Sequence, residues 1–369
     1  MKKFWLLLFL SGPLPTLAQI LDDAGIQQII LKATDKIYNY EFDEADDYIR
    51  QVKAKYPQHP VVPVMKAIQL YWQYLPLKEN KNATAQYVNY LNQGITLSKK
   101  MLDRNENDPE GVFFSMASHG YLTMKNHYDD ETMKAVGEAQ KAYNYLRKGF
   151  KLMEKNPEFY FSTGLYNYYI ERYPLDHPVS KPLLLFFQNG DMALGMRQME
   201  TAVRRGVFTR TETALYLGHI YLKHESQPAR AALLLKPLAD KYPQNPIFNL
   251  GCAEALVQSG RYRDAQAYIE RLRNLPQKFL AMPVKVLEGI TEEKMNGNHK
   301  LAAENYQNAL KLPVDEIFAK EFTAHAYSGL ARISAHSGDR NRAKSMYKKV
   351  LSIAEYKSTI REARNYLKS

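Results

Sequence analysis

The sequence has 369 residues, a single cysteine and a formal net charge of +11. One cysteine cannot form an internal disulfide, and a chain of this length buries enough apolar surface to fold without one, so a disulfide-based scaffold is excluded. The basic excess lies in the second part, where residues 161–369 hold 30 basic and 20 acidic residues. This charge favours an acidic partner or contact with an anionic membrane surface, and a solvated basic face is the alternative.

The N-terminus has the order of residues that is typical of a secretory signal peptide. Two lysines precede an apolar run from Phe4 to Leu10, and small residues follow up to Ala18. The apolar run is far shorter than the roughly 20 residues that a membrane-spanning helix needs. We therefore expect residues 1–18 to be a signal peptide, cleaved between Ala18 and Gln19. Because the only cysteine is Cys252, the lipid-acceptor cysteine of a lipoprotein signal is missing, and we expect a periplasmic or secreted protein.

The rest of the chain has helical periodicity, and no segment alternates as a strand does. Two nearly identical stretches, residues 55–60 and 241–246, each end one apolar helical segment with prolines and precede another. In chain order, we expect helices within residues 26–57, 61–75, 83–102, 111–121, 132–155, 159–172, 214–221 and 231–243, then helix pairs up to residue 358 and a last helix at 359–368. The predicted class is all-α.

One spacing of small and apolar residues recurs in the C-terminal half. Its three occurrences are Ala253, Gly260, Ala265, Ile269 and Leu272; then Gly297, Ala302, Tyr306 and Ala309; then Gly338, Ala343, Tyr347 and Val350. Small residues at these places let the axes of paired helices approach to about 8–10 Å. The spacing resembles the tetratricopeptide repeat (TPR) family. The resemblance implies a right-handed superhelical solenoid, here of about seven antiparallel helix pairs with a capping helix at 359–368, in a single domain over residues 19–369.

The repeats are expected to differ along the chain, with divergent ones at 19–160, an insertion at 173–190 and clearer ones at 191–358. The insertion contains the apolar run Leu183 to Phe187, which must fold back, meet a partner or touch a membrane. The middle of the chain, with Gly190-Asp191 followed by Gly195 and Ala202, resembles a TPR subgroup that includes the mitochondrial outer-membrane inclusion-body-clearance proteins. That resemblance implies a scaffold without chemistry.

No motif of catalysis, cofactor binding or metal binding stands out. The sequence lacks a His-Glu-x-x-His pattern, a nucleophile elbow, a phosphate-binding glycine loop and a cysteine pair. His219 and His224 are five residues apart, which turns them away from a shared metal on a helix. Cys252 follows a glycine and precedes an alanine, where closely packed helices favour a buried thiol over a nucleophile. We expect no enzyme, no cofactor and no metal.

Two alternatives to a scaffold stay open. The chain has 27 tyrosines, and Trp72 lies between Tyr71 and Tyr74. If these rings are exposed on one face, they suit glycan binding; otherwise they fill the seams between repeat helices. The second alternative is an enzyme whose site lies near the 173–190 insertion. Nucleic-acid binding is disfavoured, because the chain is expected to be exported and its aromatic and basic residues do not alternate.

A basic groove is the leading interpretation of the partner site. In a TPR array, the first helix of each pair lines the concave face, and the family's exposed positions fall here on His219, Lys223, Lys294, His325 and Arg332. On that face only Glu254 and Glu212 are expected to oppose them. Such a set suits an acidic peptide or a C-terminal carboxylate. We therefore expect an exported, non-enzymatic scaffold for protein–protein interaction, which contacts a membrane surface at most and does not span the membrane.

Overall fold

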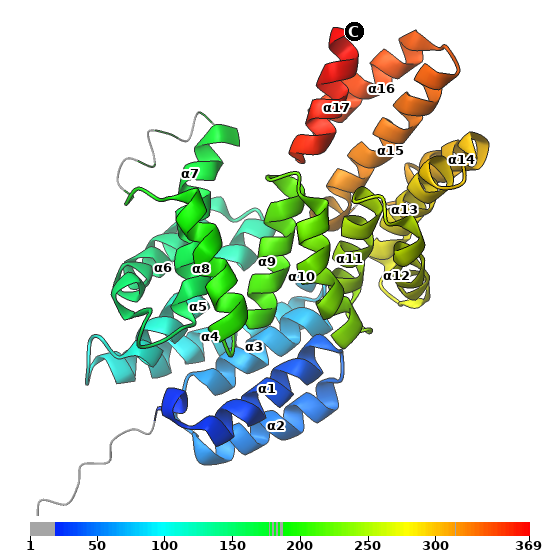
Figure 1. Ribbon diagram of the computed structural model, residues 1–369. Helices are drawn as coiled ribbons and strands as arrows, with labels where there is room; N and C mark the ends of the chain where they lie inside the picture. Colours follow the sequence, from blue (N-terminus) through cyan, green and yellow to red (C-terminus); the bar gives the residue numbers. More distant parts are fainter. Residues whose placement is uncertain (1–18, 177, 179–180, 182–183, 185–186, 314) are drawn as a thin grey trace, which may run out of the picture. The chain divides into compact units, whose positions relative to one another are not determined.

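The computed structural model describes residues 19–369 with the exception of 177, 179–180, 182–183, 185–186 and 314. Within these residues the chain is helical and forms no strand, which confirms the all-α class (Figure 1). The α-helices are α1 (Ala24–Tyr38), α2 (Phe42–Lys55), α3 (Val61–Gln73), α4 (Lys81–Leu102), α5 (Pro109–Tyr128), α6 (Thr132–Leu152), α7 (Phe159–Asp176), α8 (Met192–Arg205), α9 (Arg210–Lys223), α10 (Pro228–Lys241), α11 (Pro246–Gln258), α12 (Tyr262–Asn274), α13 (Ala281–Lys294), α14 (His299–Ala309), α15 (Glu316–His336), α16 (Arg340–Ile353) and α17 (Lys357–Lys368). The described residues also contain the single-turn 3₁₀ helices η1 (Ile20–Asp22), η2 (Leu77–Glu79) and η4 (Lys278–Leu280).

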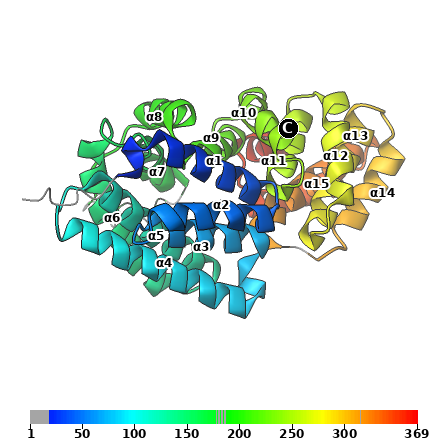
Figure 2. The ribbon, with the colours of Figure 1, turned by 90° about the horizontal axis from the view of Figure 1, so that it is seen from below.

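The described residues form two compact units. Unit 1 comprises residues 19–34 and 43–156, and unit 2 comprises residues 35–42 and 157–369. In unit 2, each helix from α7 to α17 packs against the next one in the chain, and Figure 2 shows α8 to α13 following one another from left to right. The first helices of its pairs also touch in series, α9 on α11, α11 on α13, α13 on α15 and α15 on α17. This is the packing of helical repeats.

The packing agrees with the expectation of about seven helix pairs. Among the described residues, seven successive pairs pack closely: α3 with α4, α5 with α6, α7 with α8, α9 with α10, α11 with α12, α13 with α14, and α15 with α16. The last helix, α17, begins at Lys357, two residues before the expected start. The predicted turns are confirmed, since Gly260, Gly297 and Gly338 have φ values of 77°, 64° and 85°. Only glycine adopts this left-handed region at no steric cost.

Proline and a capping side chain start several helices. The Asp108 carboxylate accepts hydrogen bonds from the backbone N–H groups of Glu110 and Gly111, at 3.0 and 2.7 Å, and Pro109 occupies the first turn of α5. Asn245 does the same for α11 ahead of Pro246. The first-turn N–H groups of a helix have no intrahelical partner, so a side-chain acceptor stabilises the start by about 1 kcal/mol. The prolines of the repeated stretches thus mark helix starts as well as ends.

A tyrosine sandwiched between two glycines forms the tightest part of the unit 2 core. The ring of Tyr306, on α14, is fully buried, and it lies against Gly289 of α13 and Gly329 of α15. A β-carbon built on Gly329 would come within 2.1 Å of the ring, and one on Gly289 within 2.6 Å. Protein interiors are close-packed, so neither glycine can carry a side chain unless the ring moves. The repeated small residues therefore do bring the helix axes close.

Most aromatic residues of unit 1 are buried or half-buried, and Tyr74 is exposed. Trp72 of α3 is only 4% exposed, so of the two alternatives for this ring the structure favours the seam between helices over a glycan-binding surface. The physical reason is that Trp72 shares its helix face with buried neighbours such as Gln69 and Met65, at helical spacing. Trp72 thus lies in the buried seam between repeat helices. Cys252 of unit 2 is also buried, as expected.

The segment that interrupts the repeats starts later than expected. Helix α7 runs through Pro174 and ends at Asp176. Of the apolar run from Leu183 to Phe187, residues 183, 185 and 186 lie outside the described residues. After the run, the chain returns to α7: the Tyr166 hydroxyl donates to the Gln188 carbonyl at 2.5 Å, and the N–H of Gly190 donates to Glu171 at 3.1 Å. This end of the insertion therefore folds back on its own repeat.

Candidate protein-interaction site

The structure distributes the five predicted partner-binding residues over three first helices of unit 2. His219 and Lys223 are on α9, Lys294 ends α13, and His325 and Arg332 are on α15. Their side chains do not form a single basic surface. Four of them, Lys223, Lys294, His325 and Arg332, belong to two clusters of basic groups and carboxylates, and most of the carboxylates come from the chain after residue 290. All three helices belong to unit 2 and are labelled in Figure 1.

The first cluster is built around Glu355, which lies in the short connection between α16 and α17. One carboxylate oxygen of Glu355 accepts from Lys320 Nζ at 2.7 Å, and the other accepts from Lys223 Nζ. The two lysines come from α15 and α9, which are about a hundred residues apart in the sequence. Burial alone would raise the pKa of Glu355, but the hydrogen bonds from the two lysines outweigh it and lower the pKa to about 2. The Glu355 carboxylate is therefore held between the ammonium groups of Lys223 and Lys320, and we call these two lysines the lysine pair.

The chain next to Glu355 is anchored by a second glutamate. The carboxylate of Glu321, on α15, accepts from the backbone N–H groups of Glu355 and Tyr356 at 2.7 and 3.2 Å. Its other oxygen accepts from the Thr359 hydroxyl at 2.7 Å. These donors surround the start of α17, where N–H groups have no intrahelical partner. Burial raises the pKa of Glu321, and these hydrogen bonds offset part of that rise. Glu321 thus caps α17 from a neighbouring helix.

Tyr356 extends this contact to α11. Its ring is 8% exposed, and its hydroxyl donates to the Glu254 carboxylate at 3.3 Å. His325 packs edge-on against the ring, and its Nε2 atom lies 3.5 Å from Glu254. Burial lowers the pKa of His325, but the Glu254 hydrogen bond outweighs it and the pKa is raised. For His219 the loss of solvent dominates, and burial lowers its pKa. Only His325 of the two predicted histidines contacts the C-terminal segment.

The second cluster surrounds Arg332. The guanidinium donates to both oxygens of Glu293, at 2.6 and 2.8 Å, and to Glu362 of α17 at 2.9 Å. Lys294 lies 3.1 Å from Glu293, which also accepts from the Tyr306 hydroxyl at 2.7 Å. Burial would raise the pKa of Glu293, but the Arg332 bonds outweigh it and lower the pKa to about 2. Arg332 is thus committed to a bidentate pair within the fold.

The expectation of only two opposing glutamates is therefore wrong. Glu293, Glu355 and Glu362 also face the predicted basic residues, and Lys320 joins them. Helix spacing within one repeat does not reveal these groups, because Glu355 and Glu362 come from the last helix and its connection. One signal in the sequence could have found them: they are the only acidic residues after position 339, in a segment that is otherwise strongly basic.

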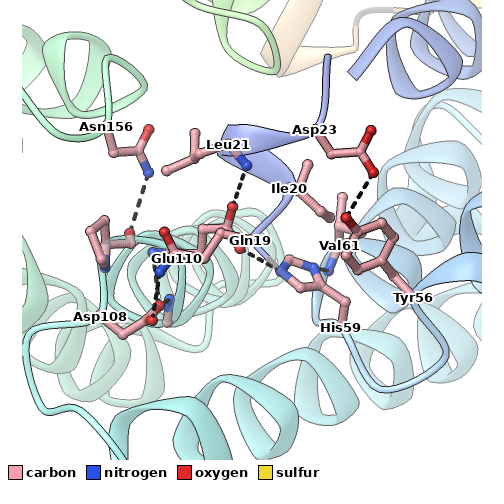
Figure 3. Close-up of polar contacts among 12 residues, drawn as sticks. Gln19, Ile20, Leu21, Asp23, Tyr56, His59, Val61, Asp108, Glu110 and Asn156 are labelled. Carbon is pink, nitrogen blue, oxygen red and sulfur yellow. Dashed lines mark hydrogen bonds and ion pairs between the residues drawn. The ribbon is translucent and has the colours of Figure 1, made fainter. Parts of the chain in front are cut away.

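A separate polar cluster in unit 1 fixes the first described residues (Figure 3). The Glu110 side chain is 2% exposed; it accepts from the backbone N–H of Leu21 at 2.6 Å and lies 2.8 Å from His59 Nε2. The N–H of Val61 donates to His59 Nδ1 at 3.1 Å, so Nδ1 carries no proton and Nε2 donates to Glu110. The side-chain amide of Gln19 donates a hydrogen bond to the Asp108 carboxylate at 3.0 Å. Glu110 thus ties the N-terminal segment to α5.

Unit 2 has a similar arrangement, in which a buried glutamate again follows a proline. Glu158 follows Asn156-Pro157 as Glu110 follows Asp108-Pro109. Its buried carboxylate accepts from the N–H groups of Val207 and Thr209, at 2.6 and 2.9 Å. A buried N–H without a partner costs about 1–3 kcal/mol, so both glutamates stabilise a turn that reaches them from elsewhere in the unit. They have a structural role, and the sequence analysis missed their shared Pro-Glu pattern.

Neither a metal site nor a membrane-spanning helix occurs in the described part of the chain. No group of three or more His, Cys, Asp or Glu side chains is arranged to hold a metal ion there. No helix among those residues is both long and apolar enough to cross a bilayer. His224 accepts a hydrogen bond from Arg172 at 3.2 Å. It is one of the two histidines, with His219, whose spacing was considered for a metal site. The geometry at the two clusters is that of ion pairs and helix caps.

Comparison with known proteins agrees with the repeat architecture. A family model for the tetratricopeptide repeat matches residues 222–280. No curated protein sequence matches the chain. Similar solved structures include yeast Tom70 (15% identity, TM-score 0.38, 82% of this chain and 63% of that one), a human IFIT1 dimer with PPP-AAAA (15%, 0.43, 96% and 86%) and a tetratricopeptide repeat protein from Parabacteroides merdae (14%, 0.33, 82% and 98%). The chain thus spans less than two thirds of the yeast protein. The TPR resemblance is confirmed: this is an all-helical repeat protein that carries tetratricopeptide repeat sequence at residues 222–280, a fold that suggests a scaffold for protein–protein interaction.

Proposed function

We propose that this protein is an exported, non-enzymatic scaffold that binds an acidic segment of another protein on the first helices of unit 2. The observation that carries the proposal is the lysine pair, because Lys223 and Lys320 converge on one carboxylate from two different helices. Two ammonium groups fixed at this spacing by the backbone are a preformed receptor for a side-chain or C-terminal carboxylate. A flexible surface lysine would lose that advantage through its side-chain entropy.

The surroundings of the lysine pair fit a peptide rather than a small molecule. The side chains of Lys223 and Lys320 are 35% and 49% exposed, so solvent and a partner can reach them. The neighbouring Tyr356 and His325 are only 8% and 11% exposed, so binding relies on the two ammonium groups, which an extended segment can reach from solvent. Charges at this exposure act mainly through orientation and association rate, and their effect falls as salt is added. We expect weak, salt-dependent binding of acidic peptides.

Arg332 and Lys294 enter the proposal in a different way from the lysine pair. Both contact Glu293, and Arg332 also contacts Glu362, so their charges are compensated within the fold. Removing Arg332 would leave Glu293 buried without its cation, which is costly. These two residues would therefore support the shape of the face, while Lys223 and Lys320 contact the partner. Variants that test binding should leave Arg332 in place.

An array of immobilised peptides of equal length with zero to four glutamates tests the proposal. We expect binding to rise with the number of glutamates and to fall with added salt. The double variant Lys223→Met/Lys320→Met keeps the aliphatic stems and removes both charges, and it should lose most of this binding while its circular dichroism is unchanged. Binding that ignores the double substitution would place the partner site elsewhere. Export is tested separately: N-terminal sequencing of protein from the cell envelope should begin at Gln19.

A further inference from the structure

The lysine pair already contains a carboxylate, which belongs to the chain itself. We propose that Glu355 is an internal stand-in for the partner, and that an acidic side chain of the partner binds by replacing the Glu355 carboxylate between Lys223 and Lys320. This inference rests on the proposed function and adds how the site is regulated. Its partner is an extended peptide that presents a carboxylate to the two lysines, as Glu355 does.

The Glu355 carboxylate can be replaced by a partner's carboxylate because the Glu355 side chain is exposed, whereas the neighbouring Tyr356 is buried and stays in place. The Glu355 side chain is 38% exposed, and its partners Lys223 and Lys320 are 35% and 49% exposed, so all three groups are open to solvent. Exposed ion pairs contribute little to stability, so replacing one carboxylate by another changes the free energy of the fold only slightly. Glu355 also lies in a connection between helices, where side-chain rotation requires no helix to unfold.

Tyr356 and the backbone at the start of α17 stay in place when the Glu355 carboxylate is replaced. Tyr356 is 8% exposed, and the N–H groups of Glu355 and Tyr356 are bonded to the buried Glu321. These bonds hold the backbone, so the Glu355 side chain can leave the lysine pair while α17 remains capped. The proposal therefore requires no displacement of α17.

Protonation does not provide the release. The lysines hold the pKa of Glu355 at about 2, so the carboxylate stays charged at any pH at which the protein is expected to work. The charged groups that face it are Lys223 of α9, Lys320 of α15 and the anchoring Glu321. Competition by a second carboxylate, or screening by salt, is the remaining way to free the lysines. The internal group competes at a high effective concentration, on the order of millimolar for a short tether.

The test uses fluorescence anisotropy with the full mature chain and a labelled, C-terminally amidated peptide that has the sequence of residues 351–356. In Glu355→Gln the lysines lose their internal carboxylate, and we expect the peptide to bind about tenfold more tightly than to wild type, the factor for an internal competitor bound about 90% of the time. A peptide with glutamine in place of glutamate should gain nothing. Glu362→Gln is the matched control, because it removes a carboxylate from the Arg332 cluster and leaves the lysine pair filled.

The outcomes separate the two proposals. Tighter binding by Glu355→Gln that is lost in Glu355→Gln/Lys223→Met supports the stand-in. Equal binding by wild type and Glu355→Gln would overturn the stand-in and leave the acidic-peptide scaffold intact. Absence of binding to either protein, with both folded by circular dichroism, would overturn the lysine pair as a peptide site and the stand-in with it. If Glu355→Gln proves unstable, Glu355→Asp, which retracts the carboxylate by one methylene, should give a smaller gain in the same direction.

Discussion

Substituting Gly329 by alanine tests the close packing that gives unit 2 its shape. A β-carbon at this position would lie 2.1 Å from Cε2 and 2.3 Å from Cζ of Tyr306, far inside van der Waals contact. The ring cannot move away easily, because Gly289 confines its other edge and Glu293 holds its hydroxyl at 2.7 Å. Overpacking typically costs 1–3 kcal/mol, and this contact belongs at the upper end. We expect Gly329→Ala to lower the free energy of unfolding by about 3 kcal/mol, after any gain in helix propensity.

The assay is urea unfolding followed by circular dichroism at 222 nm, with two further variants. Gly251→Ala is the control in the same unit, because its β-carbon would meet Leu235 at 3.4 Å, an ordinary contact, and a helical alanine can gain up to about 1 kcal/mol over glycine. In Gly329→Ala/Tyr306→Ala the clash is absent, so the double variant should be more stable than the sum of its single variants by about 2 kcal/mol. Additive effects, or a neutral Gly329→Ala, would refute the argument from ring confinement.

Three further predictions concern buried polar groups. Glu110→Ala should lower the free energy of unfolding of unit 1 by about 3 kcal/mol, because it leaves the Leu21 N–H and the His59 Nε2–H without an acceptor. In the same urea titration, substitution of the exposed Glu106 by alanine should change this free energy by under about 0.5 kcal/mol. The folded-state pKa of Glu293 is below its usual value, so the contribution of its carboxylate to the free energy of unfolding is present above about pH 4.5 and is lost as the pH falls toward 2. The stability of Glu293→Gln should therefore fall less steeply with acid than that of wild type. An identical dependence on acid pH in the two proteins would contradict the pairing with Arg332. Burial raises the pKa of the Cys252 thiol to about 12, so a disulfide reagent should label it only after urea unfolding, and rapid labelling of the folded protein would show that the site opens.

Local sequence was sufficient for the helices and for much of the packing. The apolar periodicity, the prolines and the turn glycines each act within a few residues, and the expected turns at Gly260, Gly297 and Gly338 are confirmed by their positive φ. The small residues of the repeat, such as Ala253 and Ala302, are fully buried between helices. Sequence left the place of Trp72 open, because the two interpretations of an aromatic cluster, a surface for glycan binding and a buried seam, have the same local pattern. The pattern does not say which face the neighbouring repeat covers.

The partner site shows where sequence reasoning ends. The family register predicted the helices that carry Lys223, His325 and Arg332, but it did not reveal that Glu355 and Glu362 compensate their charges. Those pairs join residues up to 132 positions apart, and their distances depend on how successive helix pairs pack across unit 2. Helix formation follows from short-range hydrogen bonds and apolar spacing, so the sequence alone determines it. Which charges meet depends on small rotations accumulated over several repeats, and only the tertiary structure decides that.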